Sequence, residues 1–235
     1  MAPVVARIGG IAITPFGVAV IVALVLGWGL GQRWAAPRIG ASARDMGLVL
    51  VFVHLGALLG SRLGFAAAHV TDVRDVMAFA QGGLDAGGTV AGASVGLVLA
   101  VRGNELWRWS DALAPVALVE AAVLRNGSYL LGSDYGRPLS GEAPGWLRAW
   151  GTYPRWDDGL GSPAWAEHVE RGLVASASPV SLPVHPIPLY ESLALALAAG
   201  AAVFVVRRFE RGGLATTWAL LAFVGVRFAL AGLRG

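Results

Sequence analysis

The sequence predicts an all-α integral membrane protein with about six transmembrane helices and a small extracytoplasmic segment between the fourth and the fifth. The 235 residues are 56% hydrophobic and only 14% charged, and the mean hydropathy is +0.63. A soluble domain is about one-quarter charged, so this composition favours the lipid bilayer. Apolar stretches recur along the chain, and arginines gather in the loops between alternate pairs of them.

The apolar stretches define the expected helices, because about 20 consecutive apolar residues are needed to cross a bilayer. The third and fourth stretches are rich in Gly and Ala, which lets neighbouring helices pack closely but leaves their ends poorly defined. We expect one membrane domain over residues 1–235, with residues 132–186 as an insertion within it. The six expected spans cover residues 12–31, 46–68, 84–101, 112–131, 187–206 and 213–233.

The distribution of arginines predicts the orientation. The short loops after the first, third and fifth spans carry eight of the 18 arginines, and the positive-inside rule places such loops in the cytoplasm. The long segment 132–186 then faces the outside. The arginines of the three loops are Arg33, Arg38, Arg44, Arg102, Arg108, Arg207, Arg208 and Arg211.

The long segment 132–186 contains four tryptophans, Trp146, Trp150, Trp156 and Trp165. Tryptophan favours the membrane–water interface, so we expect a small ordered region that rests on the outer leaflet rather than a mobile loop. The net charge of +3 is spread along the chain, which argues against nucleic acid as a partner. The chain has no cysteine, which excludes disulfides and thiolate metal sites.

Three arginines are predicted to lie deep in the spans, where charged groups are unfavourable and usually functional. They are Arg62 in LLGSRLGF, Arg125 after the run VALVEAAVL, and Arg227 in FVGVRFAL. We expect them at similar depth on three different helices. Since three buried cations require a common anion, a phospholipid phosphate is the expected ligand. For Arg62 the alternative is a side chain that extends to the outer interface.

Two aspartates stand at expected helix starts. Asp85, in GGLDAGG, is next to glycine-rich backbone, where a carboxylate can position or deprotonate a substrate; an ordinary helix N-cap explains it equally well. For Asp111, in WSDALAP, we favour the N-cap of the fourth span.

The stretch LRNGSYLLGSDYGRP, residues 124–138, holds the densest group of polar side chains. Its arginines, hydroxyls and glycine turns suit a phosphate head group, and we expect the fourth helix to break here. The candidate residues are Arg125, Ser128, Ser133, Asp134, Tyr135, Gly136 and Arg137.

The octapeptide HPIPLYES, residues 185–192, opens the fifth span. Its two prolines fit a helix start, because proline lacks the N–H group that has no partner in a first turn. His185 is expected to cap the helix or to titrate near neutral pH. Tyr190 and Glu191 are expected to face inward and to orient Arg125 or Arg227.

Together these motifs resemble those of the prolipoprotein diacylglyceryl transferase family. SRLGF at 61–65 is similar to the family's G-R-L-G-Y, and SDALAP at 110–115 to its S-D-x-x-A-P. The stretch from Arg125 to Arg137 resembles the family signature R-x-G-N-F-x-N-G-E-x-x-G-R. HPIPLYE resembles H-P-x-x-L-Y-E, and Arg227 falls on the arginine of a late helix in the family.

The resemblance implies an enzyme of the bacterial inner membrane. Such an enzyme transfers the diacylglyceryl group of phosphatidylglycerol to the lipobox cysteine of a prolipoprotein and releases glycerol phosphate. It implies phospholipid and the prolipoprotein signal peptide as partners, and neither a metal nor a nucleotide as cofactor. The expected catalytic residues are Arg125, Arg227, Asp85, Asp134 and His185. The expected substrate-binding residues are Arg62, Ser128, Ser133, Tyr135, Gly136, Arg137, Tyr190 and Glu191.

The chain departs from the family pattern at residues assigned to chemistry. Ala86 stands where the family has a histidine, and Ser133 where it has a glutamate. Loss of a catalytic base lowers a rate by about 10²–10⁴-fold. Two hypotheses therefore remain: Asp85, Asp134 or His185 takes over proton transfer, or the chain is a diverged paralogue that binds phospholipid and catalyses another lipid reaction or none.

Overall fold

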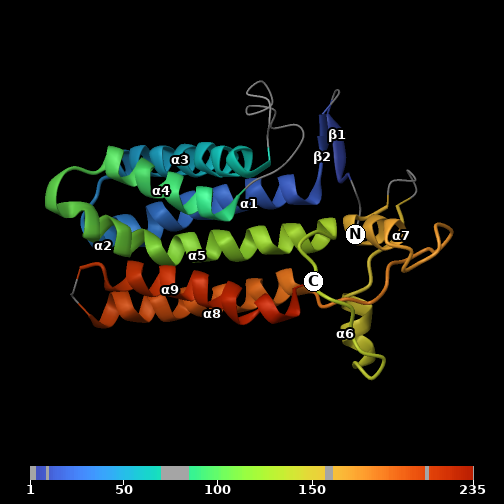
Figure 1. Cartoon of the computed structure of the whole chain (residues 1–235). Coiled ribbons are helices and arrows are strands. Elements are labelled where there is room, and N and C mark those ends of the chain that lie inside the picture. Colours follow the sequence, from blue (N-terminus) through green and yellow to red (C-terminus); the bar gives the residue numbers. More distant parts are fainter. Residues whose placement is uncertain (1–3, 9–10, 70–84, 157–160, 210–211, 235) are drawn as a thin grey trace. The chain divides into compact units, whose positions relative to one another are not determined.

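The computed structural model describes residues 4–8, 11–69, 85–156, 161–209 and 212–234 (Figure 1). Most of the expected loop between the second and third spans lies outside these residues. The described chain is mainly helical. At its start, the short strands β1 (Ala6–Ile8) and β2 (Ile11–Ile13) pair antiparallel.

Each of the six expected spans overlaps a helical stretch of the structure. The first span runs on past Leu30 through a π-helical turn, Gly31–Ala35, and the short helix α2. The fourth begins earlier than expected, at Leu106. The helices of the spans are α1 (Pro15–Leu30), α2 (Ala36–Ile39), α3 (Ala43–His69), α4 (Ala86–Ala100), α5 (Leu106–Leu131), α8 (Ile187–Arg208) and α9 (Leu214–Ala229).

Four helical stretches of the described chain are long and apolar enough to cross a membrane: Pro15–Ile39, Ala43–His69, Ile187–Arg208 and Leu214–Leu233. α4 is apolar but has only 15 residues. These findings confirm an all-α membrane protein, whereas six as the number of spans stays a prediction.

The described residues form two compact units. The first unit comprises Met1–Leu26, Ala117–Phe204 and Thr217–Gly235, and the second comprises Gly27–Val116 and Val205–Thr216. The helices α1, α5, α8 and α9 contribute residues to both units, so the boundary does not separate the chain into successive domains. The expectation of a single membrane domain stays a prediction.

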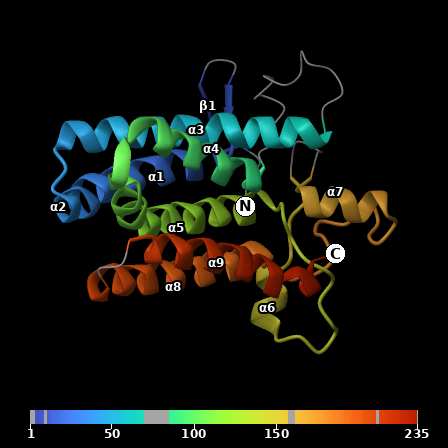
Figure 2. The ribbon, with the colours of Figure 1, turned by 60° about the vertical axis from the view of Figure 1, so that its left-hand side comes forward.

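Within the second unit, α3 and α4 lie side by side along glycine-lined faces (Figures 1 and 2). A Cβ atom on Gly92 would collide with the carbonyl of Gly56, and one on Gly88 with the carbonyl of Gly60. Only glycine permits so close an approach of two helix backbones. The predicted role of the α4 glycines in close packing is therefore confirmed.

Asp111 also belongs to the second unit, and our prediction for it is wrong. Because α5 starts at Leu106, Asp111 lies inside this helix and does not cap it. Its carboxylate instead accepts the N–H groups of Gly213 at 2.7 Å and Thr216 at 2.8 Å, so it caps the start of α9. The capping chemistry was expected, but the helix that is capped lies about a hundred residues further along the chain.

In the first unit, α8 and α9 run side by side (Figures 1 and 2), and the indole N–H of Trp218 donates to the Ala198 carbonyl at 3.1 Å. The segment 132–186 contains the short helices α6 (Gly145–Trp150) and α7 (Pro163–Glu170). Its small core holds Tyr153, Ala164 and Val184, all fully buried. The described part of the segment therefore has helices and a small core of its own, whereas its place on the outer leaflet stays a prediction.

Candidate active site

Glu191 is a buried carboxylate one turn into α8, only 1% exposed. The sequence explains its position. Pro186 precedes the helix and Pro188 is its second residue, where a missing N–H leaves no helical hydrogen bond unmade. The prolines thus set the start of α8, and the helix turns Glu191 inward. A buried carboxylate is stable only where cations or hydrogen-bond donors meet it.

Two arginines pair with Glu191. The Nε of Arg125, on α5, lies 3.2 Å from one carboxylate oxygen. The Nη2 of Arg234 donates to the other oxygen. Arg125 also donates from Nη1 to Asp134 at 3.0 Å. The expected orientation of Arg125 by Glu191 is thus present as an ion pair.

Arg227, on α9, belongs to the same group, because the charges of Arg125, Arg234, Glu191 and Asp134 all act on it. Its Nη1 atom is buried and has no hydrogen-bond partner among the described residues. We call these five residues the arginine cluster. The cluster holds three guanidinium groups and two carboxylates, so its formal charge is +1. A phosphate is the kind of anion that such a group binds.

Asp134 has a left-handed backbone conformation at the point where it joins the cluster. α5 ends at Leu131, and Gly132 and Asp134 both have positive φ angles, +78° and +57°. Aspartate is one of the few residues besides glycine that tolerate this conformation. The side chain of Asp134 is 48% exposed while that of Arg125 is 16% exposed. Asp134 is therefore the member of this pair that solvent reaches.

Arg234 was not predicted, and the backbone around Gly136 explains how it reaches the cluster. The N–H of Gly136 donates to the His185 carbonyl at 2.9 Å, and that of Arg137 donates to the Leu233 carbonyl at 2.8 Å. A Cβ on Gly136 would lie only 2.8 Å from the Ile187 side chain. Gly136 thus lets three chain segments meet. The sequence signal for Arg234 was its spacing of seven residues from Arg227. Seven residues are about two helical turns, which would place both arginines on one face of a helix.

The Tyr190 hydroxyl lies 3.4 Å from the Nδ1 atom of His185. Burial, and next the positive charge of Arg137, lower the pKa of His185 below its ordinary value. The neutral imidazole, which can accept a proton, is therefore favoured. Arg137 and His185 also line a cavity of about 780 Å³ whose apolar wall includes Leu139 and Leu147.

The family model for prolipoprotein diacylglyceryl transferase matches residues 3–235. The chain belongs to the prolipoprotein diacylglyceryl transferase family. Relatives named phosphatidylglycerol–prolipoprotein diacylglyceryl transferase occur in several bacteria. The protein of Symbiobacterium thermophilum is 26% identical, over 99% of this chain and 81% of its own. That of Burkholderia multivorans is 29% identical, over 89% and 73%. That of Aromatoleum aromaticum is 27% identical, over 67% and 61%, so the match spans less than two-thirds of this relative's length.

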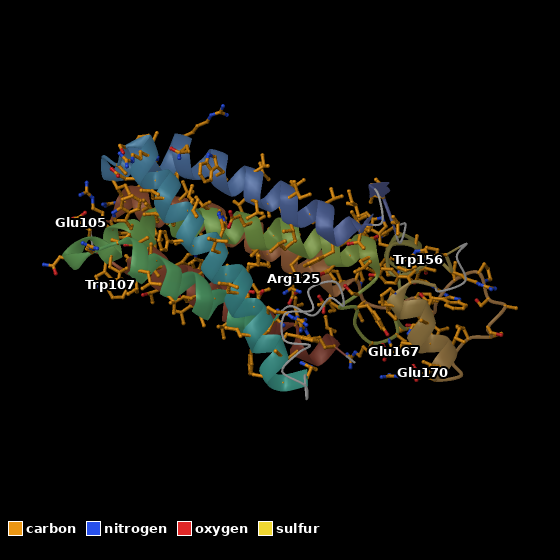
Figure 3. The ribbon with its side chains drawn as sticks, turned by 90° about the horizontal axis from the view of Figure 1, so that it is seen from above. Glu105, Trp107, Arg125, Trp156, Glu167 and Glu170 are labelled. Carbon is orange, nitrogen blue, oxygen red and sulfur yellow. The ribbon has the colours of Figure 1, made fainter. Side chains whose placement is uncertain are left out.

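In this family member, Ser128, Ser133 and Tyr135 of the stretch 124–138 make hydrogen bonds with residues outside the arginine cluster. The Ser128 carbonyl accepts the N–H of Ser133 at 3.0 Å and its hydroxyl at 3.3 Å. The Tyr135 hydroxyl donates to Glu167 on α7. Figure 3 shows Glu167 apart from Arg125. Burial and this hydrogen bond raise the pKa of Tyr135. Substrate binding by these three residues stays a prediction.

Arg62 and Asp85 belong to the second unit. A common anion for Arg62, Arg125 and Arg227 stays a prediction, as does a catalytic role of Asp85. The carboxylate of Asp85 accepts the Gly88 N–H at 2.5 Å and caps α4, as one of our two interpretations expected. The Asp85 N–H donates to the Ser61 carbonyl at 3.0 Å. Arg62 is 2% exposed, and its guanidinium carbon lies 5.4 Å from the centre of the Phe65 ring.

Proposed function

We propose that this protein transfers the diacylglyceryl group of phosphatidylglycerol to the lipobox cysteine of a prolipoprotein. The arginine cluster around buried Glu191 carries the proposal, because it offers an excess positive charge within a member of this family. The apolar helices and the arginine-rich loops support a place in the bacterial inner membrane, with segment 132–186 on the periplasmic side.

The reaction needs stabilisation of a departing phosphate. The cysteine sulfur attacks the glycerol carbon that bears the phosphate ester oxygen. A C–S bond forms, the C–O bond breaks, and its electron pair leaves with glycerol phosphate. Guanidinium groups of Arg125, Arg227 and Arg234 would meet the charge that develops on the phosphate. Such preorganised charge is usually the largest contribution to catalysis. Glu191 would hold Arg125 and Arg234 in place before the substrate arrives.

The thiol proton must pass to a base, and three observations support His185 for this role. Its lowered pKa favours the neutral imidazole at neutral pH. Asp134, in contrast, is paired with Arg125. Asp85 is engaged as the cap of α4. His185 would thereby replace the histidine that the family carries at the position of Ala86.

Ala86 is also the observation that favours a second candidate, a phospholipid-binding protein without transferase activity. Complementation separates the two. The chain is expressed in cells depleted of their own transferase, and lipidated prolipoprotein is measured by mass spectrometry. We expect rescue by the chain and by the control Arg33→Gln, which removes an exposed arginine outside the cluster. We expect no rescue by His185→Gln.

Failure of the unaltered chain to rescue, at a normal level in the membrane, would contradict the proposed transferase activity. Phosphatidylglycerol that co-purifies with such an inactive chain would then support the phospholipid-binding alternative. Rescue by His185→Gln would contradict the role of His185 as base, and Asp134→Asn and Asp85→Asn would be tested next.

A further inference from the structure

A second group of arginines surrounds a cavity of about 450 Å³ in the second unit. Its lining combines polar and apolar side chains. The polar ones are Arg38, Arg108 and Asp111, and the apolar ones include Ile39, Val206 and Phe209. We call this cavity the basic pocket. None of its residues belongs to the arginine cluster.

Arg38 is held in place without a carboxylate. Its guanidinium carbon lies 4.2 Å from the centre of the Trp34 ring, and Nη1 donates to the Trp34 carbonyl at 3.1 Å. Within the described chain no acidic side chain pairs with Arg38, and the nearby charge acting on it is that of another cation, Arg207. Its stacked guanidinium therefore presents a positive charge for which an external anion is a suitable partner.

The two carboxylates near the pocket do not remove this charge. Asp111 directs both oxygens to the start of α9, where Gly213 and Thr216 donate to them. Glu105 pairs with Arg108 at 3.0 Å, but both side chains are more than half exposed. Such a solvent-exposed pair contributes little to stability, so a phosphate can take the place of Glu105.

The pocket lies at the ends of membrane-spanning helices. Ile39 ends the candidate span Pro15–Ile39, and Val206 lies just before the end of Ile187–Arg208. Span ends lie at the level of the lipid head groups. Arginines beside an apolar wall match a phosphate that is joined to a glycerol and acyl chains. A soluble phosphate has no apolar group that could contact Ile39, Val206 or Phe209.

We propose that the basic pocket binds the head group of an anionic phospholipid in the leaflet on the arginine-rich, cytoplasmic side. Basic pockets between transmembrane helices on this side are suited to such lipids. The lipid bound here is not the one that reacts: Glu191 is near the start of α8 and Val206 near its end, and a spanning helix has its two ends at opposite leaflets. The inference does not depend on the proposed transferase activity.

The test counts phospholipids on the purified full-length chain by native mass spectrometry, with phosphatidylglycerol or zwitterionic phosphatidylcholine added. We expect Arg38→Gln with Arg108→Gln to bind one phosphatidylglycerol fewer than the unaltered chain. At this site the affinity should fall about 30-fold, because each arginine near a membrane surface contributes roughly fivefold. The matched control is Arg33→Gln with Arg44→Gln, which removes two exposed arginines outside the pocket and should leave the lipid bound.

Phe209→Asp is a second variant that leaves every arginine in place. Phe209 is 47% exposed, so the change adds a negative charge at the pocket without disturbing the core. Phe209→Asp should therefore also bind one phosphatidylglycerol fewer than the unaltered chain. Equal loss of lipid in the control pair, equal binding of phosphatidylcholine, or retention of the lipid in both pocket variants would each overturn the proposal. Complete displacement by inorganic phosphate would assign the site to a soluble anion instead.

Discussion

The arginine cluster and the basic pocket combine arginines with a carboxylate, but the carboxylate acts differently in each. In the cluster, Glu191 is 1% exposed and pairs with Arg125 and Arg234. In the pocket, both oxygens of Asp111 accept N–H groups at the start of α9. The same two residue types therefore give one site with fixed arginines and another whose arginines remain at the surface.

The difference shows that the burial of a carboxylate decides whether it fixes an arginine in one geometry. A buried carboxylate holds a guanidinium in one geometry, which suits charge that develops briefly in a transition state. Arginines that are stacked or exposed adapt to a ligand, which suits a lipid that binds and leaves. The following variants test this distinction.

The largest expected effect follows from Glu191→Gln. Removing the carboxylate charge leaves Arg125 and Arg234 facing each other, and breaking a buried ion pair costs about 3–5 kcal/mol of folding free energy. The exposed pair is the matched control: Glu105→Gln should change stability by about 0–1 kcal/mol. Thermal unfolding of both variants in the same detergent measures the two effects. Equal effects would show that burial of Glu191 does not distinguish the two sites.

A smaller effect is expected for Asp111→Ala. The change leaves the N–H groups of Gly213 and Thr216 without their acceptor, and loss of an N-cap costs about 1–2 kcal/mol. Asp111→Asn keeps one acceptor oxygen and should retain part of the stability. Thermal unfolding compares the two variants. If alanine proves no worse than asparagine, Asp111 does not cap α9 and its charge is available to the pocket.

The smallest effect concerns the pH dependence of transfer. With its lowered pKa, His185 stays neutral as the pH falls through the ordinary histidine value of about 6.5, so the rate should decline only below it. Arg137→Gln removes one of the two causes of the shift. The acid limb of the pH–rate profile should therefore move upward, toward the ordinary value. A limb that stays in place, or moves downward, would argue against His185 as the base.

The helices and the Glu191–Arg125 pair could be predicted because the signals are local. A run of apolar residues defines a span wherever its helix packs. HPIPLYES marks a helix start, and a glutamate one turn later in an apolar helix needs a buried cation as partner. The richness of the third stretch in glycine likewise indicated close packing, and the structure shows that α3 covers Gly88, Gly92 and Gly96.

The contacts that could not be predicted join residues far apart in the sequence. Arg234 meets Glu191 across 43 residues, and Asp111 meets Gly213 across 102. In both cases the residue type suggested a role, but only the folded chain identifies its partner. The basic pocket was missed for the same reason: its two arginines were assigned to two different loops by the positive-inside rule, which gives their side of the membrane and not their neighbours.

The most direct test of the arginine cluster is the rate of diacylglyceryl transfer from phosphatidylglycerol to a synthetic lipobox peptide by the purified protein and by Arg227→Gln. Arg227 has a buried Nη1 atom without a hydrogen-bond partner among the described residues, which suits it to meet the departing phosphate. We predict that kcat falls by about 10²–10³-fold. A variant that transfers at the rate of the unaltered protein would contradict the account.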